Sequence, residues 1–130
     1  MKELQIFAEA LADASRVMLI EAAQRSFTGE MKSDGSPVTV IDQAVEMRLR
    51  EMISDAYPDH GIDGEEYGEI NPEKGYVWVL DPIDGTLPFI AGIPVYGTLI
   101  ALLQDGIPVL GIIDIPATGE RWVGATGSQT

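Results

Sequence analysis

The chain has 130 residues and a mass of 14.0 kDa, which suits one domain or half of a larger protein. Apolar residues make up 45% of it and charged residues 22%, so the sequence can bury a core and is not typical of a disordered protein. Eight basic against twenty-one acidic residues leave a net charge of −13, which opposes binding to nucleic acid or anionic lipid. The absence of cysteine excludes disulfides and thiol catalysis, and the single histidine, His60, argues against His-rich metal sites and Ser-His-Asp triads.

The sequence shows no targeting or membrane-spanning segment. Apolar residues near the N-terminus are periodic rather than contiguous, unlike the unbroken apolar run of a signal peptide. No stretch approaches the roughly 18 consecutive apolar residues that a spanning helix needs. We therefore expect a cytoplasmic protein with no nucleic-acid or membrane partner.

Two helices are predicted in the first half of the chain. Apolar residues recur at helical spacing from Leu4 to about Gln24. A polar segment with Gly and Pro, residues 28–37, predicts a loop. A second helix is expected from about Thr39 to Tyr57, ending near Pro58, with an apolar stripe formed by Val45, Leu49, Met52 and Ile53.

The periodicity of the second half is that of β-strands. Short β-rich segments occupy residues 76–80, 95–103, 109–114 and 121–124. Asp105-Gly106 predicts a tight hairpin turn. Two helices followed by a β-meander indicate an α+β fold, with the two N-terminal helices packed on an antiparallel β-sheet and residues 1–130 forming a single domain.

The segment after the first predicted strand carries two close carboxylates, Asp81 and Asp84. They repel each other in so short a turn unless a positive charge lies between them, which is typical of a site for a hard cation bound by oxygens. The backbone carbonyl of Ile83 could add a ligand, and Gly85 allows the backbone to approach a ligand closely. An ordinary Asx turn is the alternative explanation for this spacing.

Two further acidic elements have ordinary explanations as well. Glu65 and Glu66 follow a glycine, and paired glutamates usually belong to a solvated surface. Asp42 lies near the start of the second predicted helix, where an aspartate commonly hydrogen-bonds to its own backbone.

The sequence does not match two other acidic motifs, and it leaves a third acidic arrangement open. An EF-hand fails over residues 59–70, because Gly61 and Ile70 stand where acidic ligands are needed. The haloacid-dehalogenase pattern fails because its nucleophilic aspartate falls at Pro82. A glycosidase carboxylate pair stays open, since the sequence does not set the separation of the two groups.

Taken together, the acidic elements resemble the motifs of the inositol monophosphatase superfamily of metal-dependent phosphatases. The three matching motifs are KSDGSPVT at residues 32–39 leading to Asp42, GEE at residues 64–66, and WVLDPIDGT at residues 78–86. Their order and spacing also agree with the superfamily. Within it, residues 89–94 and 96–102 and the strands that follow are most similar to the histidinol-phosphatases of this type.

The resemblance implies a site for Mg²⁺ ions. Glu65, Asp81 and the Ile83 carbonyl correspond to the ligands of a first ion, and Asp81 with Asp84 to ligands of a second. Bound divalent ions convert a pocket of carboxylates into one that attracts a phosphate monoester, and they lower the pKa of bound water.

The resemblance also implies the catalytic and substrate-binding residues. Glu65 and Thr86 would orient the attacking water, with Asp42 supporting a further ion or the water network. Asp84, Gly85 and Thr86 would bind substrate, with the backbone N–H groups of Gly85 and Thr86 on the phosphate. The implied reaction is hydrolysis of a small sugar or amino-alcohol phosphate, such as an inositol or histidinol phosphate, without a nucleophilic side chain.

Two departures from the superfamily pattern affect this expectation. Its members are roughly twice as long, and their second half supplies a Trp-Asp motif that completes the second metal site. We therefore expect a truncated N-terminal half with an exposed core face, which favours a homo-oligomer such as a dimer. Leu87 and Pro88 replace polar or basic residues after the signature. The alternative hypothesis is a fragment that binds metal or oligomerises without catalysis.

Overall fold

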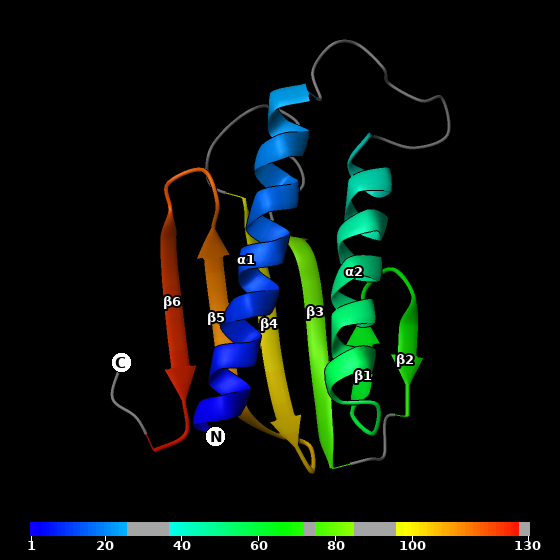
Figure 1. The fold of residues 1–130 in the computed structure, drawn as a ribbon, viewed down its shortest axis with the longest axis vertical. Coiled ribbons are helices and arrows are strands. Elements are labelled where there is room, and N and C mark those ends of the chain that lie inside the picture. Colours follow the sequence, from blue (N-terminus) through cyan, green and yellow to red (C-terminus); the bar gives the residue numbers. More distant parts are fainter. Residues whose placement is uncertain (26–36, 72–74, 85–95, 128–130) are drawn as a thin grey trace.

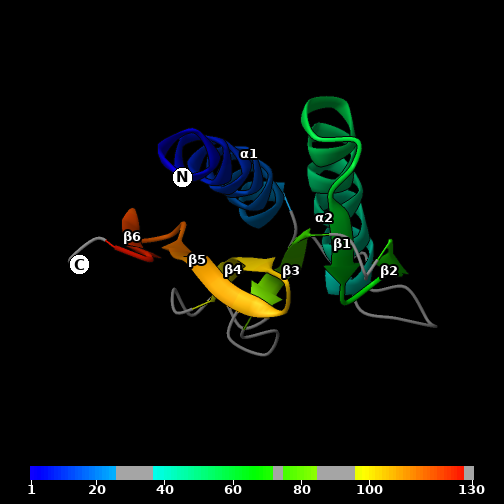
Figure 2. The ribbon, with the colours of Figure 1, turned by 90° about the horizontal axis from the view of Figure 1, so that it is seen from below.

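The structure is a computed structural model that describes residues 1–25, 37–71, 75–84 and 96–127. Within these residues, two helices lie on one face of a six-stranded β-sheet (Figures 1 and 2), which confirms the α+β fold. The elements are α1 (Lys2–Arg25), α2 (Pro37–Ala56), β1 (Gly61–Gly64), β2 (Gly68–Ile70), β3 (Tyr76–Asp84), β4 (Gly97–Gln104), β5 (Ile107–Ile115) and β6 (Glu120–Ala125).

Both predicted helices are confirmed, with small changes at their ends. The helix expected over residues 4–24 is α1 (Lys2–Arg25). The second helix starts at Pro37 rather than Thr39, because proline lacks only an N–H that the first turn does not use. It ends at Ala56, two residues before Pro58.

The expected antiparallel sheet is in fact mixed, with the strand order β2-β1-β3-β4-β5-β6. The strands β3, β4, β5 and β6 form an antiparallel meander, and β1 pairs with β2 in the same way. However, β1 and β3 are parallel. The chain reverses once into β2 and again into β3, so β3 runs in the direction of β1 and pairs with its free edge.

Two strands were missed by the sequence analysis, and three others, β3, β5 and β6, are longer than predicted. The missed strands, β1 and β2, have four and three residues and contain Gly and acidic residues, so they lack an apolar alternation. The strand expected to end at Leu80 continues to Asp84, so Asp81 and Pro82 lie inside β3 rather than in a turn.

The predicted hairpin turn at Asp105-Gly106 is confirmed between β4 and β5. Gln104 pairs with Ile107, which leaves two residues in the loop. Both have positive φ, 52° at Asp105 and 81° at Gly106, as expected of the type I′ turn that matches the twist of paired strands.

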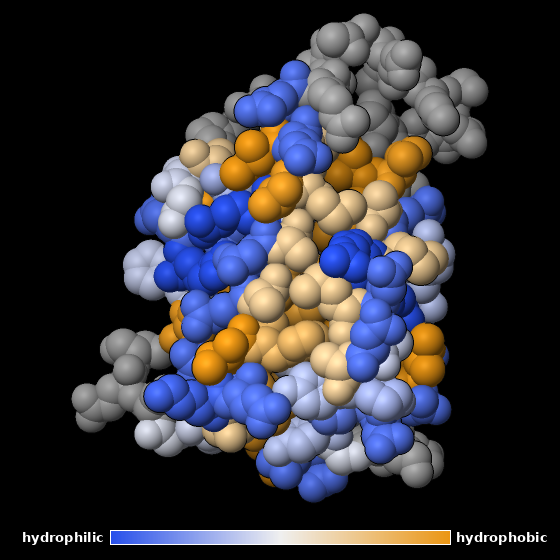
Figure 3. Space-filling model, in the orientation of Figure 1, coloured by the Kyte–Doolittle hydropathy of each residue, from blue (hydrophilic) through white to orange (hydrophobic). Residues whose placement is uncertain are grey.

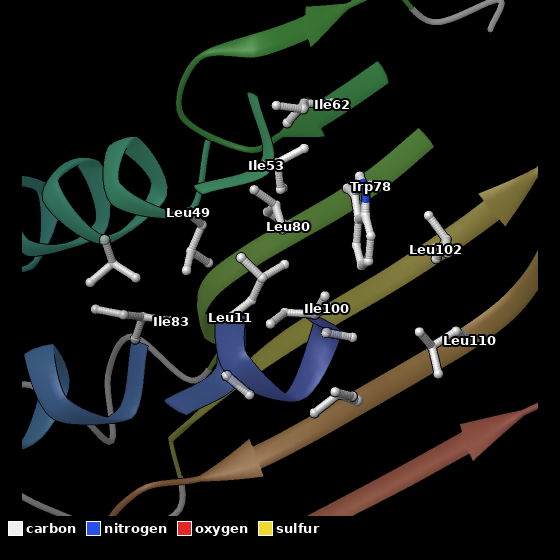
Figure 4. Close-up of a cluster of buried hydrophobic side chains, with 14 of the residues drawn as sticks. Leu11, Leu49, Ile53, Ile62, Trp78, Leu80, Ile83, Ile100, Leu102 and Leu110 are labelled. Atoms are coloured by element: carbon white, nitrogen blue, oxygen red, sulfur yellow. The ribbon is translucent and has the colours of Figure 1, made fainter. Parts of the chain in front are cut away.

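The core lies between the helices and the sheet. Leu49 and Ile53 of α2 point toward Leu80 of β3, and Trp78 and Leu102 continue the cluster along the sheet (Figure 4). On the outside of the helix layer, hydrophobic residues form a band along the two helices with hydrophilic residues beside it (Figure 3). Neither helix of the described residues is long and apolar enough to cross a bilayer.

Candidate active site

A one-residue bulge in β3 brings two predicted metal ligands onto the same face of the sheet. Side chains alternate along a strand, so residues three apart normally point to opposite faces. Here Asp81 pairs with Leu99 and Asp84 with Gly97, which is three steps along β3 against two along β4. The extra residue restores the alternation. Asp81 and Asp84 therefore share a face, while the side chain of Ile83 is buried in the core.

The parallel pairing of β1 with β3 brings the glutamate motif next to Asp81. Gly64 at the end of β1 is in register with Leu80, so the next residue on each strand places Glu65 beside Asp81. The Glu65 backbone N–H donates to the Leu80 carbonyl at 3.4 Å between N and O. The missed strand β1 is thus what joins these two motifs.

Asp42 enters the same region from α2. It lies in the second turn of the helix, and the hydrogen bond that its carboxylate makes comes from another element rather than from its own segment of backbone. A hydrogen bond from the Ile83 backbone reaches its carboxylate, and the charges of Glu66, Asp81 and Glu65 act on it. The acidic cluster is defined here as Asp42, Glu65, Glu66, Asp81 and Asp84.

Burial and repulsion from neighbouring carboxylates raise the pKa values of three members of the acidic cluster, Asp42, Asp81 and Glu66. Burial is the largest reason that the pKa of Asp42 rises from 3.8 to about 7. The pKa of Asp81 also rises to about 7, first by burial, then through a hydrogen bond with Glu65 and repulsion from that residue, Asp84 and Glu66. The pKa of Glu66 is raised as well, mainly by burial.

The chemistry of the acidic cluster fits a hard cation. Among the described residues, no Lys, Arg or His forms an ion pair with any of its five carboxylates. The Oδ1 atom of Asp81 is buried, and none of the described residues hydrogen-bonds to it. Among the described side chains, no group of three acidic residues is placed so that it could hold one metal ion as it stands. An oxygen-only donor set with an unused buried oxygen is what Mg²⁺ or Ca²⁺ binds.

The backbone of the bulge is held by a buried hydrogen-bond chain that the sequence analysis missed. The hydroxyl of Thr98 on β4 donates to the Pro82 carbonyl at 2.8 Å, and it lies 2.6 Å from the Ser15 hydroxyl of α1. Since the Thr98 proton is used on Pro82, Ser15 is the donor to Thr98. Only the strand pairing reveals this chain, because Ser15 and Thr98 are 83 residues apart.

The predicted residues Gly85 and Thr86 lie outside the described residues, as does most of the first motif. The remaining predicted residues, Asp42, Glu65, Asp81, Ile83 and Asp84, come together at one end of the sheet as described above. The roles assigned to them stay predictions.

A second feature lies on the sheet face opposite the helices. A hollow of about 690 Å³ is lined by apolar residues such as Val79, Ala101, Ile113 and Trp122, and also by Asp81. Ile113 and Trp122 are 46% and 62% exposed. An apolar lining does not suit a phosphate group, so we do not assign the phosphate to this hollow, although it shares Asp81 with the acidic cluster.

Known proteins resemble the chain over nearly all of its length. Residues 1–130 match the inositol monophosphatase family. The chain is 49% identical to bifunctional phosphatase IMPL2 of Arabidopsis thaliana over 98% of this chain and 38% of that protein. It is 40% identical to a histidinol-phosphatase of Chlorobaculum parvum over 97% of this chain and 49% of that protein.

A solved structure agrees with these sequence matches. An inositol monophosphatase from Zymomonas mobilis superposes with a TM-score of 0.83 at 41% identity, over 97% of this chain and 48% of that one. The chain thus spans less than half the length of these relatives. The match over all 130 residues nevertheless shows that the chain belongs to the inositol monophosphatase family.

Proposed function

We propose that the chain carries the metal-binding half of a Mg²⁺-dependent phosphatase for small phosphate monoesters. One observation carries the proposal: carboxylates from α2, the end of β1 and the β3 bulge converge without a cation partner among the described residues. Such an arrangement is unfavourable for the protein alone, as the raised pKa values of Asp42 and Asp81 indicate, and a bound cation relieves it.

The ligands of the proposed site are oxygens only. Glu65, Asp81, Asp84 and the backbone carbonyl of Ile83 would hold Mg²⁺. When bound, the ion supplies positive charge for the phosphate and lowers the pKa of water. The buried side chain of Ile83 anchors the bulge in the core, so its backbone has a fixed position for this role.

The chain's own groups would orient the reactants. Glu65, exposed beside Asp81, would hold the attacking water together with Thr86, and Asp42 would accept a further hydrogen bond from that water. The backbone N–H groups of Gly85 and Thr86 would donate to the phosphate oxygens. Because positioning and charge stabilisation account for most of phosphoryl transfer, no covalent intermediate is needed.

The proposed substrates are phosphates of small polyols or amino alcohols. This proposal is supported by relatives named histidinol-phosphatase and inositol-1-monophosphatase.

The test measures Mg²⁺-dependent release of phosphate from histidinol phosphate and inositol 1-phosphate, beside calorimetric titration of the chain with Mg²⁺. We expect Glu65→Gln to lose metal-dependent turnover, because an amide cannot replace the carboxylate charge. Glu69→Gln, a matched change at an exposed glutamate of β2, should behave as wild type. Full turnover by Glu65→Gln would contradict the proposed role of this residue.

A second candidate function is metal binding or self-association without turnover. The exposed apolar residues of the hollow, Ile113 and Trp122, favour it, since such surfaces commonly mark interfaces. This candidate predicts heat of Mg²⁺ binding with no phosphate release, and a dimer in sedimentation that Trp122→Lys dissociates. Turnover by a monomeric chain would reject it.

A further inference from the structure

Glu46 of α2 is a buried carboxylate that the proposed chemistry does not use. Its side chain has no solvent exposure, and it sits one helical turn beyond Asp42 on the same face of the helix. Burying a carboxylate is costly unless its oxygens are fully hydrogen-bonded. The groups that donate hydrogen bonds to Glu46 therefore indicate its role in the structure.

Both oxygens of Glu46 accept hydrogen bonds from the backbone that follows Glu65. Oε1 accepts from the Glu66 N–H and Oε2 from the Tyr67 N–H, each at 2.9 Å between heavy atoms. These N–H groups belong to the turn between β1 and β2, called here the Glu65 turn (residues 65–67). The carboxylate thus holds two consecutive peptide groups next to a predicted metal ligand.

Arg50 completes this contact from the same helix. Its Nε donates to Glu46 Oε2 at 2.9 Å, and its Nη2 donates to the Gly68 carbonyl at the end of the turn. The Arg50 guanidinium also lies over the Tyr67 ring, 5.9 Å from its centroid. The pair therefore binds both the N–H and the C=O side of the turn, which a surface ion pair would not do.

The glycine of the GEE motif has its explanation in the same contact. A Cβ atom at Gly64 would lie 2.2 Å from Oε2 of Glu46, far inside van der Waals distance. Glycine is needed at this position so that the buried carboxylate can reach the turn.

We propose that Glu46 is a positioning residue, whose buried carboxylate fixes the Glu65 turn so that Glu65 stands beside Asp81. The proposal rests on the proposed function, since it takes Glu65 as a metal ligand. Residues that orient metal ligands typically change metal affinity by about 10–100-fold when they are replaced.

The test compares Glu46→Gln with Glu51→Gln, a matched change at an exposed residue of the same helix whose ion pair with Arg48 does not touch the turn. Glutamine keeps the shape, but its NH₂ group cannot accept from a backbone N–H. We expect Glu46→Gln to weaken Mg²⁺ binding by calorimetry about tenfold or more, with Glu51→Gln like wild type. Equal Mg²⁺ affinity in folded Glu46→Gln and wild type overturns the proposal.

A second measurement needs neither metal nor activity. Hydrogen exchange by NMR in the metal-free chain should show the Glu66 and Tyr67 amides protected in wild type and about tenfold faster in Glu46→Gln. Unprotected amides in wild type overturn the proposal even if the variant does not fold. A wild-type chain that binds no Mg²⁺ contradicts the proposed function instead, and the exchange rates still decide the role of Glu46.

Discussion

Two groups of carboxylates in this molecule have opposite surroundings. On β5, Asp114 is fully buried and accepts from Arg16 Nε at 3.0 Å and from Arg121 Nε at 2.7 Å. Arg121 also reaches Asp13 on α1. The acidic cluster at the end of β3 has no such cation among the described residues, and the pKa values of Asp42 and Asp81 are raised to about 7.

This difference in surroundings distinguishes a carboxylate that stabilises the fold, Asp114, from carboxylates that are available to bind a cation. The two guanidinium groups neutralise Asp114 within the protein, and they tie α1 to β5 and β6. The acidic cluster is left with unbalanced negative charge, which costs stability in the metal-free chain and favours a cation. Four experiments test this contrast.

The largest expected effect is on folding, at Asp114. Asp114→Asn leaves two partly buried arginines without their carboxylate, and should lower the free energy of unfolding by about 3 kcal/mol, the lower end for a broken buried pair. Urea unfolding measures it. Asp13→Asn removes an exposed partner of Arg121 and should cost less than about 1 kcal/mol. Equal losses of unfolding free energy in the two variants would show that the burial of Asp114 adds nothing to its effect on stability.

The second-largest effect is expected at Asp81, where a substitution should raise the stability of the metal-free chain instead of lowering it. Asp81→Asn removes one charge from the acidic cluster, so the metal-free chain should melt at a higher temperature than wild type. Mg²⁺ affinity should fall by about 100-fold or more, since loss of a ligand costs at least as much as loss of a residue that orients one. Calorimetry measures both quantities. A lower melting temperature with unchanged Mg²⁺ affinity would place Asp81 with Asp114 as a structural charge.

A smaller effect is expected where the fold supports the acidic cluster. Thr98→Val keeps the shape but leaves the Pro82 carbonyl and the Ser15 hydroxyl without their bonds, at a cost of about 1–2 kcal/mol. Mg²⁺ binding should weaken with it, because the bulge carries Asp81 and Asp84. Thr98→Ser keeps the hydroxyl and serves as the control. A stable Thr98→Val with normal Mg²⁺ binding would show that the bulge holds without this chain.

The smallest effect is a pH dependence of stability without metal. Asp42 and Asp81 bind more protons in the folded than in the unfolded state between pH 3.8 and about 7. Their contribution to the free energy of unfolding therefore falls as the pH rises through this window. Urea unfolding at pH 5 and 8 should show a smaller decrease for Asp42→Asn than for wild type. Equal decreases would mean that the pKa of Asp42 is not raised in the folded chain.

The helices and most of the meander could be predicted because their patterns are local. Leu11, Leu19, Val45 and Leu49 are buried as the helical spacing indicates, and Asp105-Gly106 forms the turn that its residue types favour. The strand β1 could not be predicted, because four residues with two glycines and an aspartate have no β pattern of their own.

The candidate site was predicted in part, and that prediction came from the family resemblance rather than from a local pattern. The motifs containing Asp42, Glu65, Asp81 and Asp84 were identified by resemblance, whereas the residues themselves had ordinary alternatives. Nothing in the sequence marked Glu46, since its i,i+4 spacing to Arg50 is that of a common surface ion pair.

The sequence by itself determined the helical faces, the hairpin turn and the excess of negative charge, because each depends on neighbouring residues or on composition. Only the tertiary structure decided which acidic groups meet. The extra residue in β3 turned Asp81 and Asp84 to one face, and parallel pairing set Glu65 beside Asp81. Strand register and long-range burial depend on segments distant in the chain, so no local pattern encodes them.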